Sequence, residues 1–136
     1  MYPAELVKPM SEDLTNAGFE ALHTVEAVDA AIKKEGTTIV VVNSVCGLAA
    51  AKASPGAKMS LKNDKKPTTI VTVFASVDKE AGNQARAHMV PFPPSSPSMA
   101  LFKNGELVHM LERHHIEGRP AELIAENLMD AYNEHC

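Results

Sequence analysis

The stretch TTIVVVNSVCGLAAAKA, residues 37–53, decides the fold that the rest of the chain has to satisfy. It opens with β-branched residues, Thr37 to Val42, and no polar residue alternates with them. A strand of this composition is typically buried on both faces, as in the middle of a parallel sheet. We therefore predict that the central strand of a sheet begins at Thr37.

The second half of the stretch places a cysteine where this strand gives way to a helix. Asn43 and Ser44 end the β-branched run, and Cys46-Gly47 precedes an alanine-rich helix predicted from Leu48 to Ala53. Unsatisfied backbone N–H groups and the positive end of a helix dipole favour thiolate over thiol at such a junction. Cys46 is therefore a candidate nucleophile, and the alternative is a small apolar side chain that fills a tight corner.

Composition limits the classes of protein to which the chain can belong. With 136 residues, 45% hydrophobic and 22% charged, the sequence is that of a single globular domain, residues 1–136. The net charge of −4 argues against a nucleic-acid partner, and no apolar run has the length of a membrane span. The N-terminus has no signal-peptide pattern, and Cys46 and Cys136 are not a secreted disulfide framework. We expect a cytoplasmic protein.

Periodicity and turn residues predict the order helix, helix, strand, helix, strand, helix, strand, strand, helix. The expected helices are residues 5–17, a second after the N-cap Thr24, the cysteine helix ending at Ser54-Pro55-Gly56, a fourth from Asp78 to His88 and a last one from Pro120. The further strands are Thr68–Ala75 and a hairpin of Met99–Phe102 and Leu107–Leu111, whose Asn104-Gly105 suits a type I′ turn. We expect an α/β fold, a mixed central sheet with helices on both faces.

This order, with a cysteine after the first long strand, is similar to the thioredoxin arrangement. The segment from Ser96 to Glu106 resembles the part of thioredoxin in which a cis-proline precedes a strand that turns through Lys-Asn-Gly into the next. The resemblance implies that Pro97 is the cis-proline beside the reactive cysteine and that Ser96 offers backbone groups to an incoming chain. The alternative is a trans-proline in a loop already rich in proline.

Longer motifs resemble the bacilliredoxin family over nearly the whole chain. They are Val-Val-Asn-Ser-Val-Cys-Gly at 41–47, Pro-Pro-Ser-Ser-Pro-Ser-Met-Ala-Leu at 93–101, Ile-Glu-Gly at 116–118, Gly-Phe-Glu at 18–20, Val-Thr-Val-Phe-Ala at 71–75 and the C-terminal cysteine. The resemblance implies removal of bacillithiol from mixed disulfides on client proteins. It assigns the nucleophile to Cys46 with Gly47 beside it, and substrate binding to Asn43, Ser44, Ser96 and Pro97.

The chain departs from the usual Cys-Gly-Cys motif of that family, because Leu48 stands at the second cysteine position and Ala49 at the thioredoxin spacing. A monothiol route through Cys46 remains feasible, with bacillithiol as co-substrate, no bound cofactor, and bacillithiol or another redoxin as reductant. Outright disulfide reduction or isomerisation would be weak. Cys136 could resolve the adduct only if its Cα came within about 7 Å of that of Cys46. The alternative is an exposed terminal thiol.

Two other functions remain open at this point. Cys46-Gly47-Leu48-Ala49 loosely resembles the Cys-Gly-Phe-Ser of monothiol glutaredoxins, which would imply a 2Fe–2S cluster between two subunits. The loss of the second cysteine also suits a redox-inactive thioredoxin-fold interaction protein. The histidine spacing predicts no metal site. Arg113, with His114, is a candidate contact for an anionic thiol, and the sequence leaves the oligomeric state open.

Overall fold

The structure is a computed structural model that describes residues 14–43, 47–75, 77–90, 92 and 97–136, with only the backbone described for residues 47–52. The helix predicted over residues 5–17 therefore falls almost wholly outside the described residues. Gly18, the residue just beyond that predicted helix, has the positive φ of +107° that a helix-terminating glycine adopts, and Phe19 is buried in the core.

A five-stranded mixed sheet lies at the centre of the fold, with the strand order β1-β3-β2-β4-β5. The strands β1, β2 and β3 are mutually parallel, whereas β4 runs antiparallel to β2, and β5 antiparallel to β4. Their bounds are Glu20–Ala21, Thr37–Asn43, Thr69–Phe74, Ser98–Lys103 and Glu106–Leu111. Every residue of β2 is buried, as its unbroken β-branched sequence predicted.

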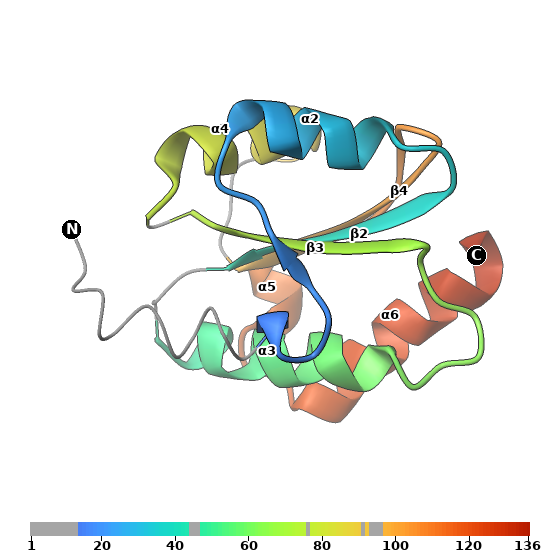
Figure 1. The fold of residues 1–136 in the computed structure, drawn as a ribbon. Helices are drawn as coiled ribbons and strands as arrows, with labels where there is room; N and C mark the ends of the chain where they lie inside the picture. Colours follow the sequence, from blue (N-terminus) through green and yellow to red (C-terminus); the bar gives the residue numbers. More distant parts are fainter. Residues whose placement is uncertain (1–13, 44–46, 76, 91, 93–96) are drawn as a thin grey trace.

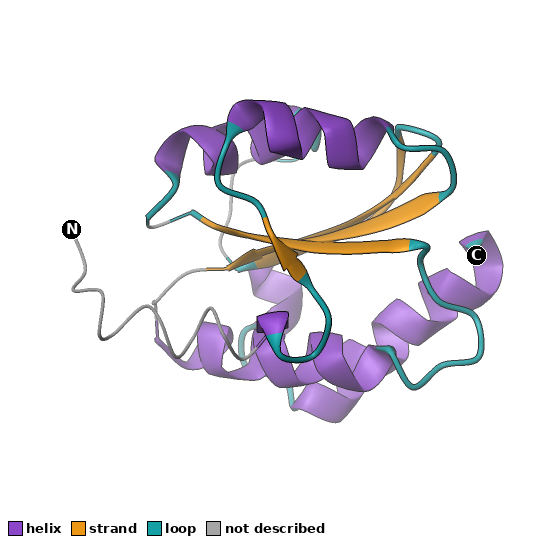
Figure 2. Ribbon diagram, viewed as in Figure 1, coloured by secondary structure: helices purple, strands orange, loops and turns teal. Residues whose placement is uncertain are grey.

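Helices cover both faces of this sheet, so the fold has three layers (Figures 1 and 2). On one face lie α2, Val25–Lys33, and α4, Lys79–Ala87. On the other lie α3, Gly47–Ser60, the short α5, Arg113–Ile116, and α6, Ala121–His135. Because side chains alternate along a strand, Ile39 and Val41 enter the core under α3 and α6, whereas Val40 and Val42 enter the core under α2.

Two predictions that depend only on residues close together in sequence, a helix cap and a hairpin turn, were confirmed. The Thr24 hydroxyl accepts the Ala27 N–H at 3.1 Å and caps α2. Asn104 and Gly105 have φ of 51° and 85°, the two positive values that a type I′ turn requires. Asp78 is the N-cap of α4, but its side chain makes no capping bond and instead lies 2.8 Å from Nδ1 of His23.

The predicted end of the cysteine helix was wrong, because α3 continues through Pro55 and Gly56 to Ser60. The reason is tertiary contact. A Cβ at Gly56 would lie 2.6 Å from Cγ2 of Ile124, so glycine is what allows α6 to approach α3 this closely. That packing outweighs the hydrogen bond that Pro55 removes from the helix.

Other differences lie in short or terminal elements. The sequence analysis missed β1 and α5, which have two and four residues and are too short to show a period. The periodicity of the last helix predicts inward packing of five apolar side chains; of these Leu123 is half exposed, whereas Ile124, Leu128, Ala131 and Tyr132 are buried.

Candidate functional site

The sheet topology brings the predicted site segments to one edge. The parallel strands β2 and β3 both end there, at the left of Figure 1, and the register places Ser98 opposite Val42 and Leu111 opposite Met99. The start of β4 and the end of β5 therefore lie at the same edge, which we call the carboxyl edge. Gly47 of α3, Pro97 and Arg113 each lie within a few residues of these strand ends.

Three of the predicted site residues, Ser44, Cys46 and Ser96, lie outside the described residues. The segments that flank them are described. Asn43 is the last residue of β2 and Gly47 is the first residue of α3, so Cys46 immediately precedes this 14-residue helix in sequence. The N-terminus of a helix of this length carries the positive end of its dipole.

Asn43 is buried, and its side chain is turned towards α3. Its Nδ2 donates to the hydroxyl of Ser54 at 3.3 Å, and its backbone carbonyl accepts the N–H of Ala75 at 3.0 Å. Asn43 therefore ties the end of β2 both to the middle of α3 and to the chain that follows β3. These contacts fix the position of the last residue of β2, which precedes residues 44–46 in sequence.

Pro97 is buried at the beginning of β4. The next residue, Ser98, is fully buried and pairs with Val42. Because β4 and β2 are neighbours in the sheet, Pro97 lies beside the end of β2, the strand that precedes Cys46 in sequence. The structure thus brings Pro97 and Asn43 to the same part of the carboxyl edge.

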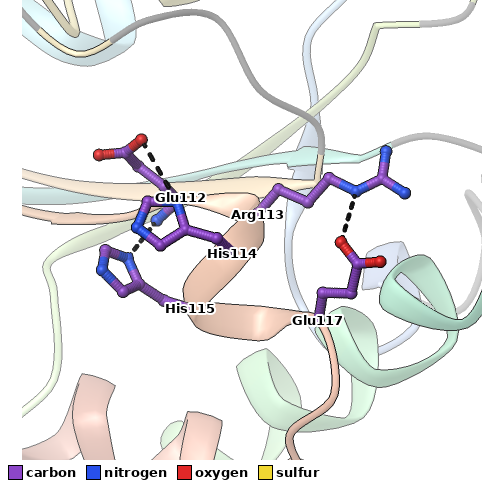
Figure 3. Close-up of polar contacts among 5 residues, drawn as sticks. All are labelled: Glu112, Arg113, His114, His115 and Glu117. Carbon is purple, nitrogen blue, oxygen red and sulfur yellow. Dashed lines mark hydrogen bonds and ion pairs between the residues drawn. The ribbon is translucent and has the colours of Figure 1, made fainter.

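The helix α5 follows β5 directly at the carboxyl edge, and Figure 3 shows how its polar side chains lie. Its N-cap is Glu112. The carboxylate of Glu112 accepts the backbone N–H of His115, while the backbone N–H of Glu112 donates to Nδ1 of His115 at 3.0 Å. On the other side of the helix, Nε of Arg113 donates to Glu117 at 3.2 Å.

The sequence analysis missed this reciprocal cap, although the sequence holds a signal for it. A capping box pairs the N-cap with the residue three positions later, and here the pair is Glu112 and His115 instead of the usual Ser or Thr with Glu. Burial lowers the pKa of His115. The nearby charges of His114, Arg119 and His109 lower it further, while the Glu112 carboxylate opposes them.

Cys136 lies at the other end of the molecule from Gly47. Its thiol is exposed, and its N–H donates to the Tyr132 carbonyl at 2.8 Å, so the chain is still helical there. The Tyr132 hydroxyl lies 3.0 Å from that of Ser60, the last residue of α3. A 14-residue helix is about 20 Å long, and Figure 1 shows the beginning of α3 and the C-terminus on opposite sides of the molecule.

No group of three histidine, cysteine, aspartate or glutamate side chains in the described parts of the chain could hold a metal ion. His109 instead contacts Asn127 of α6, with Nε2 2.7 Å from the amide oxygen. None of the described helices combines the length and the apolar character needed to cross a bilayer.

Comparisons with known proteins agree with this geometry. The family model described as disulphide isomerase matches residues 2–136. A bacilliredoxin of Cytophaga hutchinsonii is 57% identical over 98% of this chain and 99% of its own length. A bacilliredoxin of Halalkalibacterium halodurans is 52% identical over 99% and 94%.

Solved thioredoxins share the fold at low sequence identity. A mutant thioredoxin of Halobacterium salinarum gives a TM-score of 0.62 at 13% identity and covers 88% of this chain and 91% of its own. Mitochondrial thioredoxin 3 of Saccharomyces cerevisiae gives 0.62 at 13%, covering 90% and 98%. The predicted thioredoxin-like α/β fold is therefore confirmed.

Proposed function

The chain belongs to the bacilliredoxin family, and from that membership we propose that it removes bacillithiol from mixed disulfides on client proteins by a monothiol route through Cys46. The observation that carries the proposal is the convergence at the carboxyl edge. There Pro97 lies beside the end of β2, and Cys46 stands in the short segment that joins β2 to α3, immediately before α3 in sequence.

The chemistry is two successive thiol–disulfide exchanges. The Cys46 thiolate attacks the bacillithiol sulfur of the mixed disulfide, and the client cysteine leaves as a thiolate that takes a proton from water. A second bacillithiol thiolate then attacks the adduct on Cys46. Bacillithiol disulfide leaves, and the Cys46 thiolate is regenerated. In the sum of the two steps, one free bacillithiol takes the place of the client cysteine in the disulfide, so one disulfide is broken, one is formed, and the protein itself undergoes no net oxidation.

The N-terminus of α3 supports the first of these steps. Its dipole and its unsatisfied backbone N–H groups stabilise a thiolate at the preceding residue relative to a thiol. The charge is needed because the thiolate, not the thiol, is the nucleophile. A Leu at position 48 leaves no second thiol beside Cys46, so the adduct persists until a thiol from solution or from another redoxin resolves it.

Arg113 is the group that we propose contacts the anionic bacillithiol. It is the first residue of α5, its side chain is partly exposed, and Glu117 holds its Nε. Its guanidinium is a permanent cation at the same edge as Pro97. Glu117 orients the guanidinium of Arg113, and the carboxylate of Glu117 competes with an anionic ligand for that guanidinium.

A turnover assay tests the proposal. A bacillithiolated client would be mixed with excess bacillithiol and the wild-type protein, Cys46→Ser or Cys136→Ser, and recovery of the client thiol would be followed. We expect wild type and Cys136→Ser to accelerate recovery equally, and Cys46→Ser to give only the uncatalysed rate. Equal losses in the two variants, or full activity of Cys46→Ser, would overturn the monothiol assignment.

A further inference from the structure

We infer that His115 is a positioning residue whose neutral imidazole holds α5 against the end of β5, and that protonation of this ring releases the cap and makes the carboxyl edge pH-sensitive. The cap itself follows from the contacts of the described residues alone. Its consequence for catalysis rests on the proposed function, because it concerns the position of Arg113.

The cap dictates the protonation state of the ring. The Glu112 backbone N–H is a permanent donor, and it points at Nδ1 of His115 at 3.0 Å. Nδ1 must therefore be unprotonated and accept, which leaves the proton of the neutral ring on Nε2. An imidazolium carries protons on both nitrogens, so it has no acceptor to offer and would place N–H against N–H. Protonation and the observed cap are mutually exclusive.

The groups around His115 also disfavour its protonation. His114 lies beside it, with ring centroids 4.0 Å apart, and His109 of β5 and Arg119 of the following loop act on it as further cationic or titratable groups. Only the Glu112 carboxylate among these neighbours favours the charged ring.

Two kinds of contact join the described part of α5 to its surroundings, this cap and one buried side chain. The helix has four residues, and Ile116 is the buried one, packed into the core under α3 and α6. Glu112 and Arg113 lie at the other end of the helix, where the chain leaves β5. When the His115 bond is lost, Ile116 still anchors the carboxyl end of α5, whereas the end that carries Arg113 loses one of the hydrogen bonds that fix it at the end of β5.

The structure suggests a matched pair of variants. In the ordinary capping box the N3 residue is Glu or Gln, and its side-chain oxygen accepts the N-cap N–H. His115→Gln replaces a titratable acceptor with one that does not titrate, so it keeps the cap at every pH. His114→Gln removes the neighbouring histidine, which is exposed and 3.8 Å from Glu112, and leaves the acceptor in place.

The test is amide hydrogen exchange of Glu112 by NMR, expressed as a protection factor between about pH 7.5 and pH 5.5, the range in which histidine titrates. We expect protection to fall at least several-fold on acidification in the wild type and in His114→Gln, and to stay constant in His115→Gln. Equal pH dependence in wild type and His115→Gln would overturn the inference. A second readout needs no variant: the ¹⁵N chemical shifts of the His115 ring in the wild type at neutral pH. Shifts that place the proton on Nδ1 would also overturn the inference.

A kinetic measurement then connects the cap to the site. The ratio of KM values for a bacillithiolated client, wild type over His115→Gln, cancels the titration of Cys46, which both proteins share. We expect this ratio to rise on acidification. If the client is not turned over at all, the proposed function fails while the amide result stands. A flat ratio with a pH-sensitive amide would overturn the link between the cap and Arg113.

Discussion

The hydroxyl of Tyr132 lies 3.0 Å from Oγ of Ser60, and both side chains are fully buried. Ser60 gives its own proton to the Ala57 carbonyl at 2.6 Å, so Tyr132 is the donor in the contact. The bond joins the end of α3 to the last turn of α6. It thereby sets Cys136 at the end of α3 that is remote from Gly47.

Tyr132→Phe should reduce the free energy of unfolding by about 1 kcal/mol, the net value of one buried hydrogen bond. The loss stays small because Ser60 keeps its bond to Ala57. Urea denaturation of Tyr132→Phe measures this loss of unfolding free energy, and Ser60→Ala is measured beside it for comparison. A loss above about 3 kcal/mol would show that the hydroxyl does more than this one contact.

The same tyrosine predicts an alkaline limit to stability. Burial raises the pKa of Tyr132 to about 12, so the folded state holds this proton more tightly than the unfolded chain does. The stabilisation is complete below the ordinary value of 10.0 and is lost as pH rises from there towards 12. Denaturation midpoints between these values should therefore fall more steeply for the wild type than for Tyr132→Phe; parallel curves would contradict the assignment.

Gly56→Ala should destabilise the protein by about 1–3 kcal/mol, because the new Cβ would lie 2.6 Å from Cγ2 of Ile124. Helix propensity alone predicts the opposite sign, since alanine is the better helix former by about 1 kcal/mol. A double-mutant cycle with Ile124→Gly, which removes both Cγ2 and the Cβ that would lie 2.8 Å from the new methyl group, separates the two effects. The cost of Gly56→Ala should shrink in the Ile124→Gly background, and an unchanged cost would place the strain elsewhere.

Acidification should destabilise the wild type more than His115→Gln. The pKa of His115 is held below its usual range by burial and by its cationic neighbours, so the unfolded chain binds this proton first. Stability is therefore complete above about pH 6.5, the ordinary histidine value, and declines as pH falls from there towards the lowered value. Chemical denaturation across this range measures the difference, and identical profiles would contradict it.

Arg113→Gln should raise KM for a bacillithiolated client about two- to five-fold and leave kcat unchanged, since an exposed ion pair contributes at most ~1 kcal/mol. Lys103→Gln is a matched control, because it removes one exposed positive charge from the opposite end of β4. Glu117→Gln, which removes the competing carboxylate, should lower KM. An equal effect of the Arg113 and Lys103 substitutions would indicate steering by net charge alone.

The sequence predicted those parts of the fold whose causes are local. Burial on both faces of β2 follows from residues 37–42, and the hairpin turn follows from the positive φ that Asn104-Gly105 tolerates. The course of α3 through Pro55 could not be predicted in this way, because the compensating contact is with Ile124, which is distant in sequence. The four-residue α5 depends on a histidine in a role that Glu or Gln usually fills.

The candidate site could likewise be predicted only in part. The topology brings the end of β2, the start of β4 and the end of β5 to one edge of the sheet. It therefore also places Asn43, Pro97 and Arg113 at that edge. How these side chains are engaged does not follow. The amide of Asn43 donates to Ser54 because β2 packs against the middle of α3. Glu117 binds Arg113 because the chain forms the one-turn helix α5 between them, and a helix this short has no visible period in the sequence.

The most direct test of the central claim is the mass of the intact protein after anaerobic mixing with a stoichiometric bacillithiolated client, without free bacillithiol. The account predicts a gain of one bacillithiol on this chain as the client thiol is released, and peptide mapping should place the adduct on Cys46. A freed client without an adduct on this chain, or an adduct that maps to Cys136, would contradict the monothiol transfer through Cys46.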